Sequence, residues 1–153
     1  MNMENEIILK TGDKDFLNEI RELWEELNQL HLEKSLDFKS HYRKFTFQAR
    51  EQALLSNTEK KKLFIIIAYL KEVKIGYCVS SVVDDVGEID SIYIKPEYRN
   101  RRIGNMLIEA SLNWINENNV KSISIAVSVG NEEVFGFYAK YGFKPRLTIL
   151  QLS

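Results

Sequence analysis

The sequence has 153 residues, the length of one ordinary domain with a single core, and we expect one domain over residues 1–153. Its 44% hydrophobic and 28% charged residues are typical of a soluble globular protein. The 21 basic and 22 acidic residues give a net charge of −1. This balance argues against a nucleic-acid partner, because nucleic-acid-binding proteins usually carry a basic excess over a whole face.

The amino-terminal residues and the single cysteine indicate a cytoplasmic location. Residues 1–6 are polar without a visible secretory signal, and the longest apolar run, residues 63–70, is too short to span a bilayer. Cys78 is the only cysteine, which excludes an internal disulfide and fits a reducing compartment. We interpret Cys78 as a small core residue, because it lies in a strand pattern with no histidine near it in sequence.

The first half of the chain predicts a strand, two helices and a hairpin. Residues 7–9 form the strand, and the turn at residues 11–13 precedes a helix whose apolar positions keep helical spacing as far as Leu30. A second helical segment is expected over residues 40–55. Residues 63–70 and 75–83 predict two buried strands of an antiparallel hairpin.

The second half predicts three more strands and two helices. A strand over residues 88–94 ends before Pro96, and apolar residues at helical spacing predict a helix over residues 103–115. A strand over residues 122–129, a short helix from Asn131 to Gly142 and a final strand over residues 143–152 follow. The predicted fold is therefore an α/β mixed sheet with helices on both faces, in the order β-α-α-β-β-β-α-β-α-β.

A basic loop separates the strand at residues 88–94 from the helix that follows it. Arg99, Arg101 and Arg102 surround the point at which the helix exposes its first unpaired N–H groups. These groups and the positive end of the helix dipole favour an anion such as phosphate, to which arginine adds bidentate contacts. The alternative is a solvated basic turn.

This loop resembles the phosphate loop of the GNAT superfamily of acyl-CoA-dependent N-acetyltransferases, which follows the pattern Q/R-x-x-G-x-G/A. Arg99, Ile103 and Gly104 fit the pattern, whereas Arg102 stands in the slot of the first glycine. A positive φ at that slot would cost a non-glycine residue about 1–2 kcal/mol. We favour the alternative in which Arg102 already belongs to the first helical turn.

A second motif strengthens the resemblance. Asn131 opens a short helix that carries Phe135 and Tyr138 and ends at Gly142, similar to the N…F-Y-x-x-x-G-F ending of GNAT proteins. Alone, the aromatic residues would be interpreted as core. The resemblance covers the chain from about residue 7 by element order and residues 87–143 by motif as well.

The resemblance implies a cofactor site for acetyl-CoA. The backbone of three strand residues would bond the pantetheine arm and acetyl carbonyl, loop amides would hold the pyrophosphate, and the Asn131 side chain would contact the pantetheine. The implied cofactor-binding residues are Ile92, Tyr93, Ile94, Arg99, Asn100, Arg101, Arg102, Ile103, Gly104, Asn105, Asn131, Phe135 and Tyr138.

The implied activity is transfer of the acetyl group to a primary amine of a small molecule or protein, by direct attack in a ternary complex. The amine must first lose a proton, and the departing thiolate benefits from a donor. By the resemblance, Tyr138 would be the general acid and Glu88 the base. Asp90, on the same side of the strand, or a water could replace Glu88.

The sequence leaves open other classes of function and the identity of the acceptor amine. A CoA-binding regulatory or interaction module would keep the loop without transfer, and a nucleic-acid-binding protein could use the same arginines. No metal-ligand spacing is present. His31, His41, Tyr42 and Phe45 could border the acceptor site, as the first two helices do in this family, and the final strand could pair across a homodimer.

Overall fold

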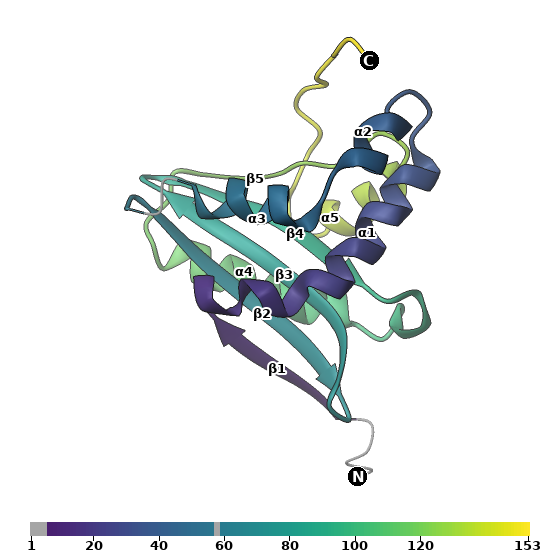
Figure 1. Cartoon of the computed structure of the whole chain (residues 1–153). Helices are drawn as coiled ribbons and strands as arrows, with labels where there is room; N and C mark the ends of the chain where they lie inside the picture. The colour runs from purple at the N-terminus through teal and green to yellow at the C-terminus, as the bar shows by residue number, and fades with distance from the viewer. Residues whose placement is uncertain (1–5, 57–58) are drawn as a thin grey trace.

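The computed structural model describes residues 6–56 and 59–153 and contains a five-stranded sheet of order β1-β2-β3-β4-β5 (Figure 1). The polar stretch at residues 1–5 lies outside the described residues. Neighbours from β1 to β4 pair antiparallel, whereas β4 and β5 are parallel. The strands are β1 (Ile7–Gly12), β2 (Lys61–Leu70), β3 (Val73–Val83), β4 (Val86–Ile94) and β5 (Ser122–Ile125).

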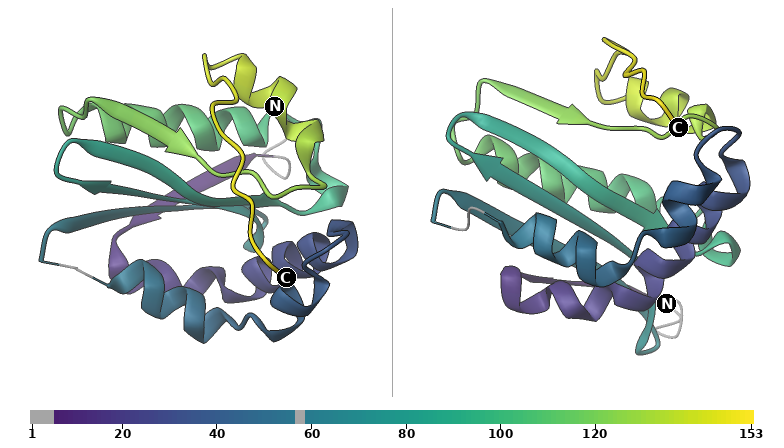
Figure 2. Two further views of the ribbon diagram at one scale, coloured as in Figure 1. Left: turned by 90° about the horizontal axis from the view of Figure 1, so that it is seen from above. Right: turned by 45° about the horizontal axis from the view of Figure 1, so that its top comes forward.

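Helices cover both faces of the sheet, as the sequence predicts (Figure 2). The first face carries a 3-10 helix at Lys14–Ile20, then α1 (Arg21–Lys34), α2 (Lys39–Lys44) and α3 (Phe47–Leu55). The second face carries α4 (Ile103–Asn116) and α5 (Phe135–Ala139). Within the described residues, no helix combines the length and the apolar character needed to cross a bilayer.

The core has one hydrophobic cluster on each face, because successive side chains of a strand point to opposite sides. In β2, Ile65 and Ile67 pack with α1 and α3, while Ile66 and Ala68 pack with α4. All four side chains are fully buried, which explains why β2 is a continuous apolar run in the sequence. The sheet is thus the middle layer of the fold, with β4 and β5 at one edge.

Two irregularities open that edge. A β-bulge in β4 leaves Asp90 without a partner in β3, since Val79 pairs with Ser91 and Ser80 with Ile89. The pairing of β4 with β5 stops at Ile89, so residues 90–94 have no strand neighbour on that side. The two strands therefore diverge beyond Ile89.

Three predicted elements differ in the structure. The segment over residues 40–55 is two helices, because Thr46 caps α3 through a bond from Ala49 N to its Oγ1 at 3.1 Å. The strand expected at residues 122–129 ends at Ile125, where β5 leaves β4. The final strand predicted at residues 143–152 is wrong, because these residues form no regular secondary structure. Their β-branched and leucine pattern meets no neighbouring strand, which a strand requires.

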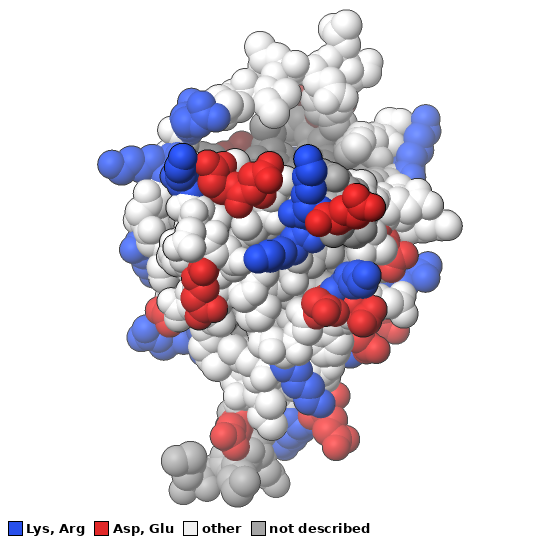
Figure 3. Space-filling model, turned by 90° about the vertical axis from the view of Figure 1, so that its left-hand side faces the viewer, with Lys and Arg blue, Asp and Glu red and all other residues white. Residues whose placement is uncertain are grey.

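Charges of both signs are interspersed on the face shown in Figure 3, where Lys or Arg side chains lie beside Asp or Glu. Oppositely charged side chains also form ion pairs at the protein surface, including Lys74 with Glu19 at 2.6 Å. Such an arrangement gives this face no extended field of one sign.

Candidate active site

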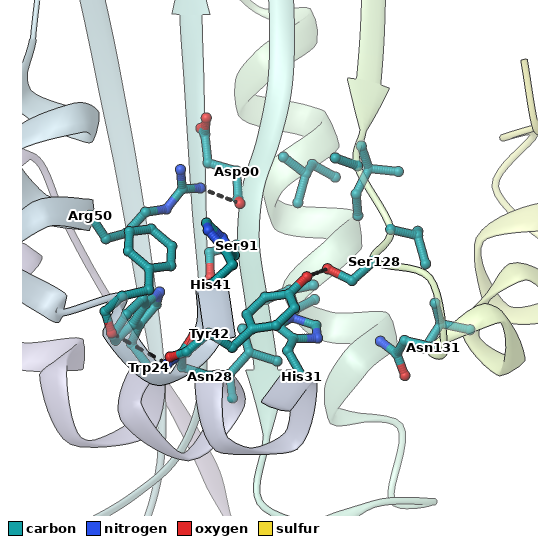
Figure 4. Close-up of a pocket in the computed structure, with 18 of the residues that line it drawn as sticks. Trp24, Asn28, His31, His41, Tyr42, Arg50, Asp90, Ser91, Ser128 and Asn131 are labelled. Atoms are coloured by element: carbon teal, nitrogen blue, oxygen red, sulfur yellow. Dashed lines mark hydrogen bonds between the residues drawn. The ribbon is translucent and has the colours of Figure 1, made fainter. Parts of the chain in front are cut away.

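A cavity of about 250 Å³ lies where β4 and β5 diverge. One wall comes from α1, α2 and Arg50 of α3, and the floor comes from β4 residues 89–92 (Figure 4). The other wall comes from the end of β5 and the chain that follows it, residues 125–128, with Asn131, Val134 and Tyr138. The site therefore combines segments that lie far apart in the sequence.

The unpaired part of β4 leads from this cavity to the start of α4. Asp90 lines the cavity, and four residues later Ile94 packs against the first turn of α4, where a Cβ on Gly104 would lie 3.3 Å from Ile94 Cδ1. Four residues of extended strand span about 13 Å. An elongated ligand with peptide-like groups can pair with the free backbone along this path.

The basic loop adopts left-handed backbone at two residues. Asn100 has φ of 65° and Arg102 has φ of 64°. The expectation that Arg102 belongs to the first helical turn is wrong, because Arg102 is the residue that precedes α4. The turn into the helix thus requires a positive φ at the usual glycine slot, at a cost of about 1–2 kcal/mol.

The start of α4 suits an anion. No side chain caps the helix, so its first N–H groups remain free, and Arg99 to Arg102 are all exposed around it. Arg99 Nε donates to Ile94 O at 3.0 Å, and its guanidinium lies 5.6 Å from the Tyr93 ring centroid. Arg99 therefore fastens the loop to the end of β4 while keeping further donors for an anion.

Two residues in the first turn of α4 hold this helix against α5. A Cβ on Gly104 would lie 3.2 Å from Phe137 Cζ, so the glycine permits the close approach of the two helices. Asn105 Nδ2 donates to Tyr141 Oη at 2.6 Å, near the end of α5. The loop and the α5 motif, which the sequence suggested separately, are in direct contact.

The α5 motif contributes Tyr138 and Asn131 to the cavity, but not Phe135. Tyr138 is 8% exposed, and burial raises the pKa of its hydroxyl above the usual value, which keeps it protonated. Asn131 Oδ1 accepts a bond from Lys34 Nζ at 3.2 Å. Phe135 is 40% exposed and lies outside the cavity lining.

The two candidate bases differ in position. Asp90 lines the cavity, whereas Glu88 does not. Burial, assisted by a hydrogen bond with Glu88, raises the pKa of Asp90 to about 7. Asp90 Oδ2 has no hydrogen-bond partner, and in Figure 4 the carboxylate points away from Tyr42 and Asn28. The effect of Glu88 on the pKa of Asp90 agrees with the alternation that places both side chains on one side of β4.

The residues expected to border the acceptor site do line the cavity. His31, His41, Tyr42 and Phe45 form part of its α1–α2 wall. Tyr42 contacts both histidine rings, with ring centroids 5.5 Å away for His31 and 4.9 Å away for His41. Burial lowers the pKa of His31, which favours a neutral imidazole, and His31 Nδ1 has no hydrogen-bond partner.

Sequence reasoning missed two functional candidates, Arg50 and Ser128, both of which line the cavity. Arg50 Nη2 donates to the backbone oxygen of Asp90 at 2.7 Å, and Tyr42 Oη donates to Ser128 Oγ at 3.0 Å. A lone arginine in a helix and a lone serine after a strand carry no local signal. Only the tertiary fold brings them to the cavity.

Cys78 is confirmed as a core residue. Its side chain is fully buried, burial raises its pKa to about 11, and Ser111 Oγ donates to Sγ at 3.2 Å. A thiol with such a pKa is a poor nucleophile at neutral pH. Within residues 6–56 and 59–153, no group of three His, Cys, Asp or Glu side chains is placed to hold a metal ion.

Comparison with known proteins agrees with this geometry. Residues 18–143 match the Acetyltransferase (GNAT) family, and the chain belongs to this family. A protein of Bacillus subtilis (strain 168), named as a candidate ribosomal protein bS18-alanine N-acetyltransferase, is 36% identical over 70 residues. This match spans 46% of our chain and 46% of the relative.

Solved structures with low sequence identity share the fold. PaiA N-acetyltransferase from Thermoplasma acidophilum, in complex with coenzyme A, has a TM-score of 0.72 at 19% identity over 94% of our chain and 93% of its own. The aminoglycoside N-acetyltransferase AAC(6')-Iy, in complex with CoA, has a TM-score of 0.66 at 19% identity over 97% and 94% of the two chains. The predicted fold class is therefore confirmed.

Proposed function

We propose that this protein is an acetyl-CoA-dependent N-acetyltransferase that acetylates a primary amine by direct attack in a ternary complex. The observation that carries the proposal is the unpaired stretch of β4, which joins a cavity at Asp90 to an uncapped helix start beside Gly104. The named activities of the relative and of the structural neighbours support the same class of reaction.

The residues fit each part of acetyl-CoA. Backbone groups of Ile92, Tyr93 and Ile94 would pair with the pantetheine, and free amides from Arg99 to Asn105 would bind the pyrophosphate. Asn131, which lines the cavity, would contact the pantetheine once its bond to Lys34 opens. Phe135, which is exposed, would bind outside the cavity.

The chemistry needs one proton acceptor and one proton donor. The amine loses its proton to the pair of Asp90 and Glu88. Because the Asp90 carboxylate points away from Tyr42 and Asn28, a water would carry the proton from the amine to this pair. We assign the pair rather than Glu88 alone, because only Asp90 lines the cavity. Tyr138 then protonates the departing thiolate, since its raised pKa keeps it protonated.

Transfer itself is tested by mixing the purified protein with acetyl-CoA and a panel of primary amines, and measuring thiol release together with the mass of the acetylated product. We expect amine-dependent release that saturates in both substrates. Thiol release at the same rate with and without amine would show that no acetyl group reaches the amine, and would favour a CoA-binding module. No release with any amine would contradict the proposal.

We also propose a homodimer formed through the carboxy-terminal segment. Leu147, Ile149, Leu150 and Leu152 are 61–97% exposed, and β5 is the last strand of the sheet, with a free outer edge within the described residues. A free edge and an unpaired apolar segment on the same chain are complementary between two copies. Sedimentation velocity is expected to show a dimer that Leu150→Asp disrupts; a wild-type monomer at high concentration would contradict it.

A further inference from the structure

The charges that line the cavity limit the kind of amine that it can accept. Among the described residues that line the cavity, and apart from the two histidines, only Arg50 has a strongly basic side chain and only Asp90 has a carboxyl group. The remaining polar lining consists of neutral amides and hydroxyls, and a large part is apolar or aromatic. The cavity therefore holds one permanent positive charge and a single carboxyl.

Arg50 is available to a ligand. One of its donors is used by the backbone oxygen of Asp90 at 2.7 Å, and a guanidinium has five donors. Within the described residues, no ion pair joins Arg50 to a carboxylate.

The acidic side chains that could attract a polycation lie elsewhere. Glu26 pairs with Lys95 at 3.1 Å, and Asp85 pairs with Lys121 at 3.6 Å. Neither acid lines the cavity. A polyamine or an aminoglycoside would therefore place several ammonium groups beside Arg50 with Asp90 as the one carboxyl of the described lining, which is electrostatically unfavourable.

The aromatic part of the wall defines the rest of the acceptor. Trp24 and Phe45 line the cavity and contact each other edge to face, with ring centroids 5.3 Å apart. Burying an apolar side chain against them is favourable. A ligand that bridges Arg50 and these rings needs an anionic group and an apolar group in one small molecule.

We propose that the acceptor is a free amino acid or a close analogue: one primary amine, one carboxylate that pairs with Arg50, and an apolar or aromatic side chain that contacts Trp24 and Phe45. This inference rests on the proposed acetyltransferase function. It separates the protein from acetyltransferases of polycations and of protein amino termini, because the amino terminus of a peptide has no carboxylate next to its amine.

The test compares matched acceptors. Apolar and aromatic amino acids, their amides, spermidine, kanamycin and a peptide amide with an amino-terminal alanine are acetylated by the wild type and by Arg50→Gln and Arg50→Lys. The amide retains the amine and side chain but lacks the carboxylate. Each amino acid and its amide are compared in the wild type and in the Arg50 variants, as in a double-mutant cycle. Differences in reactivity between the amines therefore cancel.

We expect Arg50→Gln to lower the ratio of kcat/KM for the amino acids to kcat/KM for their amides by about 10- to 100-fold, as for a lost bond to a charged group. Loss of the Arg50 bond to the Asp90 backbone oxygen lowers kcat/KM for both acceptors and cancels in this ratio. Arg50→Lys should retain part of the preference. An equal loss for both acceptors would show that Arg50 only holds the Asp90 carbonyl, and would overturn the inference.

The remaining outcomes are also decisive. Preferred transfer to spermidine, kanamycin or the alanine peptide would overturn the acceptor class and leave the acetyltransferase function intact. Absence of transfer to any acceptor by the folded wild type would overturn the acetyltransferase function itself, and this inference with it.

Discussion

Tyr42 and Ser128 lie 86 residues apart in the sequence, yet the Tyr42 hydroxyl donates to Ser128 Oγ at 3.0 Å and joins the two walls of the cavity (Figure 4). Asn28 Nδ2 donates to the Tyr42 backbone oxygen at 2.8 Å and holds α2 against α1. On the opposite wall, Gly130 packs so closely on α1 that a Cβ there would lie 2.5 Å from Lys34 O. The width of the cavity thus depends on these contacts.

Tyr42→Phe should raise KM for the acceptor and lower stability by about 0.5–1.5 kcal/mol, because it removes one partly buried hydrogen bond. Ser128→Ala should do the same, and the double variant should lose little more. Steady-state kinetics and urea unfolding measure both effects. Tyr69→Phe, in β2 and outside the cavity, is the control; additive losses in the double variant would contradict the link.

Tyr138→Phe should lower kcat by about 10- to 10,000-fold, the range of general acid–base catalysis, with little change in acetyl-CoA affinity. The hydroxyl is the proposed proton donor, and the ring that packs in the core is retained. Tyr69→Phe is again the control, because Tyr69 lies in β2 and does not line the cavity. Unchanged turnover in folded Tyr138→Phe would remove Tyr138 from the mechanism.

Arg102→Gly should be more stable than Arg102→Ala by about 1 kcal/mol, since both variants lose the same charge and only glycine accepts the φ of 64° without strain. The entropy that glycine loses on folding offsets part of the gain. Urea denaturation of the two variants measures the difference. Equal stability would show that this residue relaxes out of the left-handed region in solution.

Asp90 should make the protein less stable as pH rises. Its folded pKa of about 7 lies above the usual value, so the folded state binds a proton more tightly than the unfolded state between about pH 4 and 7. The free energy of unfolding should therefore fall over this window, by at most about 1.4 kcal/mol per pH unit for one proton.

Asp90→Asn should remove this contribution, so the difference between wild type and variant should change across the window and stay constant below it. Urea unfolding at a series of pH values gives that difference, with exposed Asp37→Asn as the control. A difference that is independent of pH would contradict the raised pKa of Asp90.

The sequence predicted the sheet well in the segments whose structure depends mainly on the burial of apolar side chains. The strands β2 and β3 and the helix α4 have strong apolar patterns, and all three occur where expected. The two motifs also predicted the loop before α4 and the placement of Tyr138 and Asn131 at the cavity. Each of these features is encoded by residues close together in the chain.

Features that depend on distant partners could not be predicted in this way. The carboxy-terminal residues from Leu147 to Leu152 have strand propensity, but no strand forms because no neighbour supplies hydrogen bonds. The φ of Arg102 depends on how the loop closes between β4 and α4, and the role of Arg50 depends on Asp90, 40 residues away.

The most direct test of the account is calorimetric titration of the wild type with acetyl-CoA, beside Arg99→Ala, Arg102→Ala and the control Arg21→Ala on the exposed surface of α1. We predict one site per chain with a micromolar Kd, about −8 kcal/mol, which weakens in the two loop variants and is unchanged in the control. Absence of binding by the folded wild type, or equal affinity in all four proteins, would contradict the assignment of the phosphate loop.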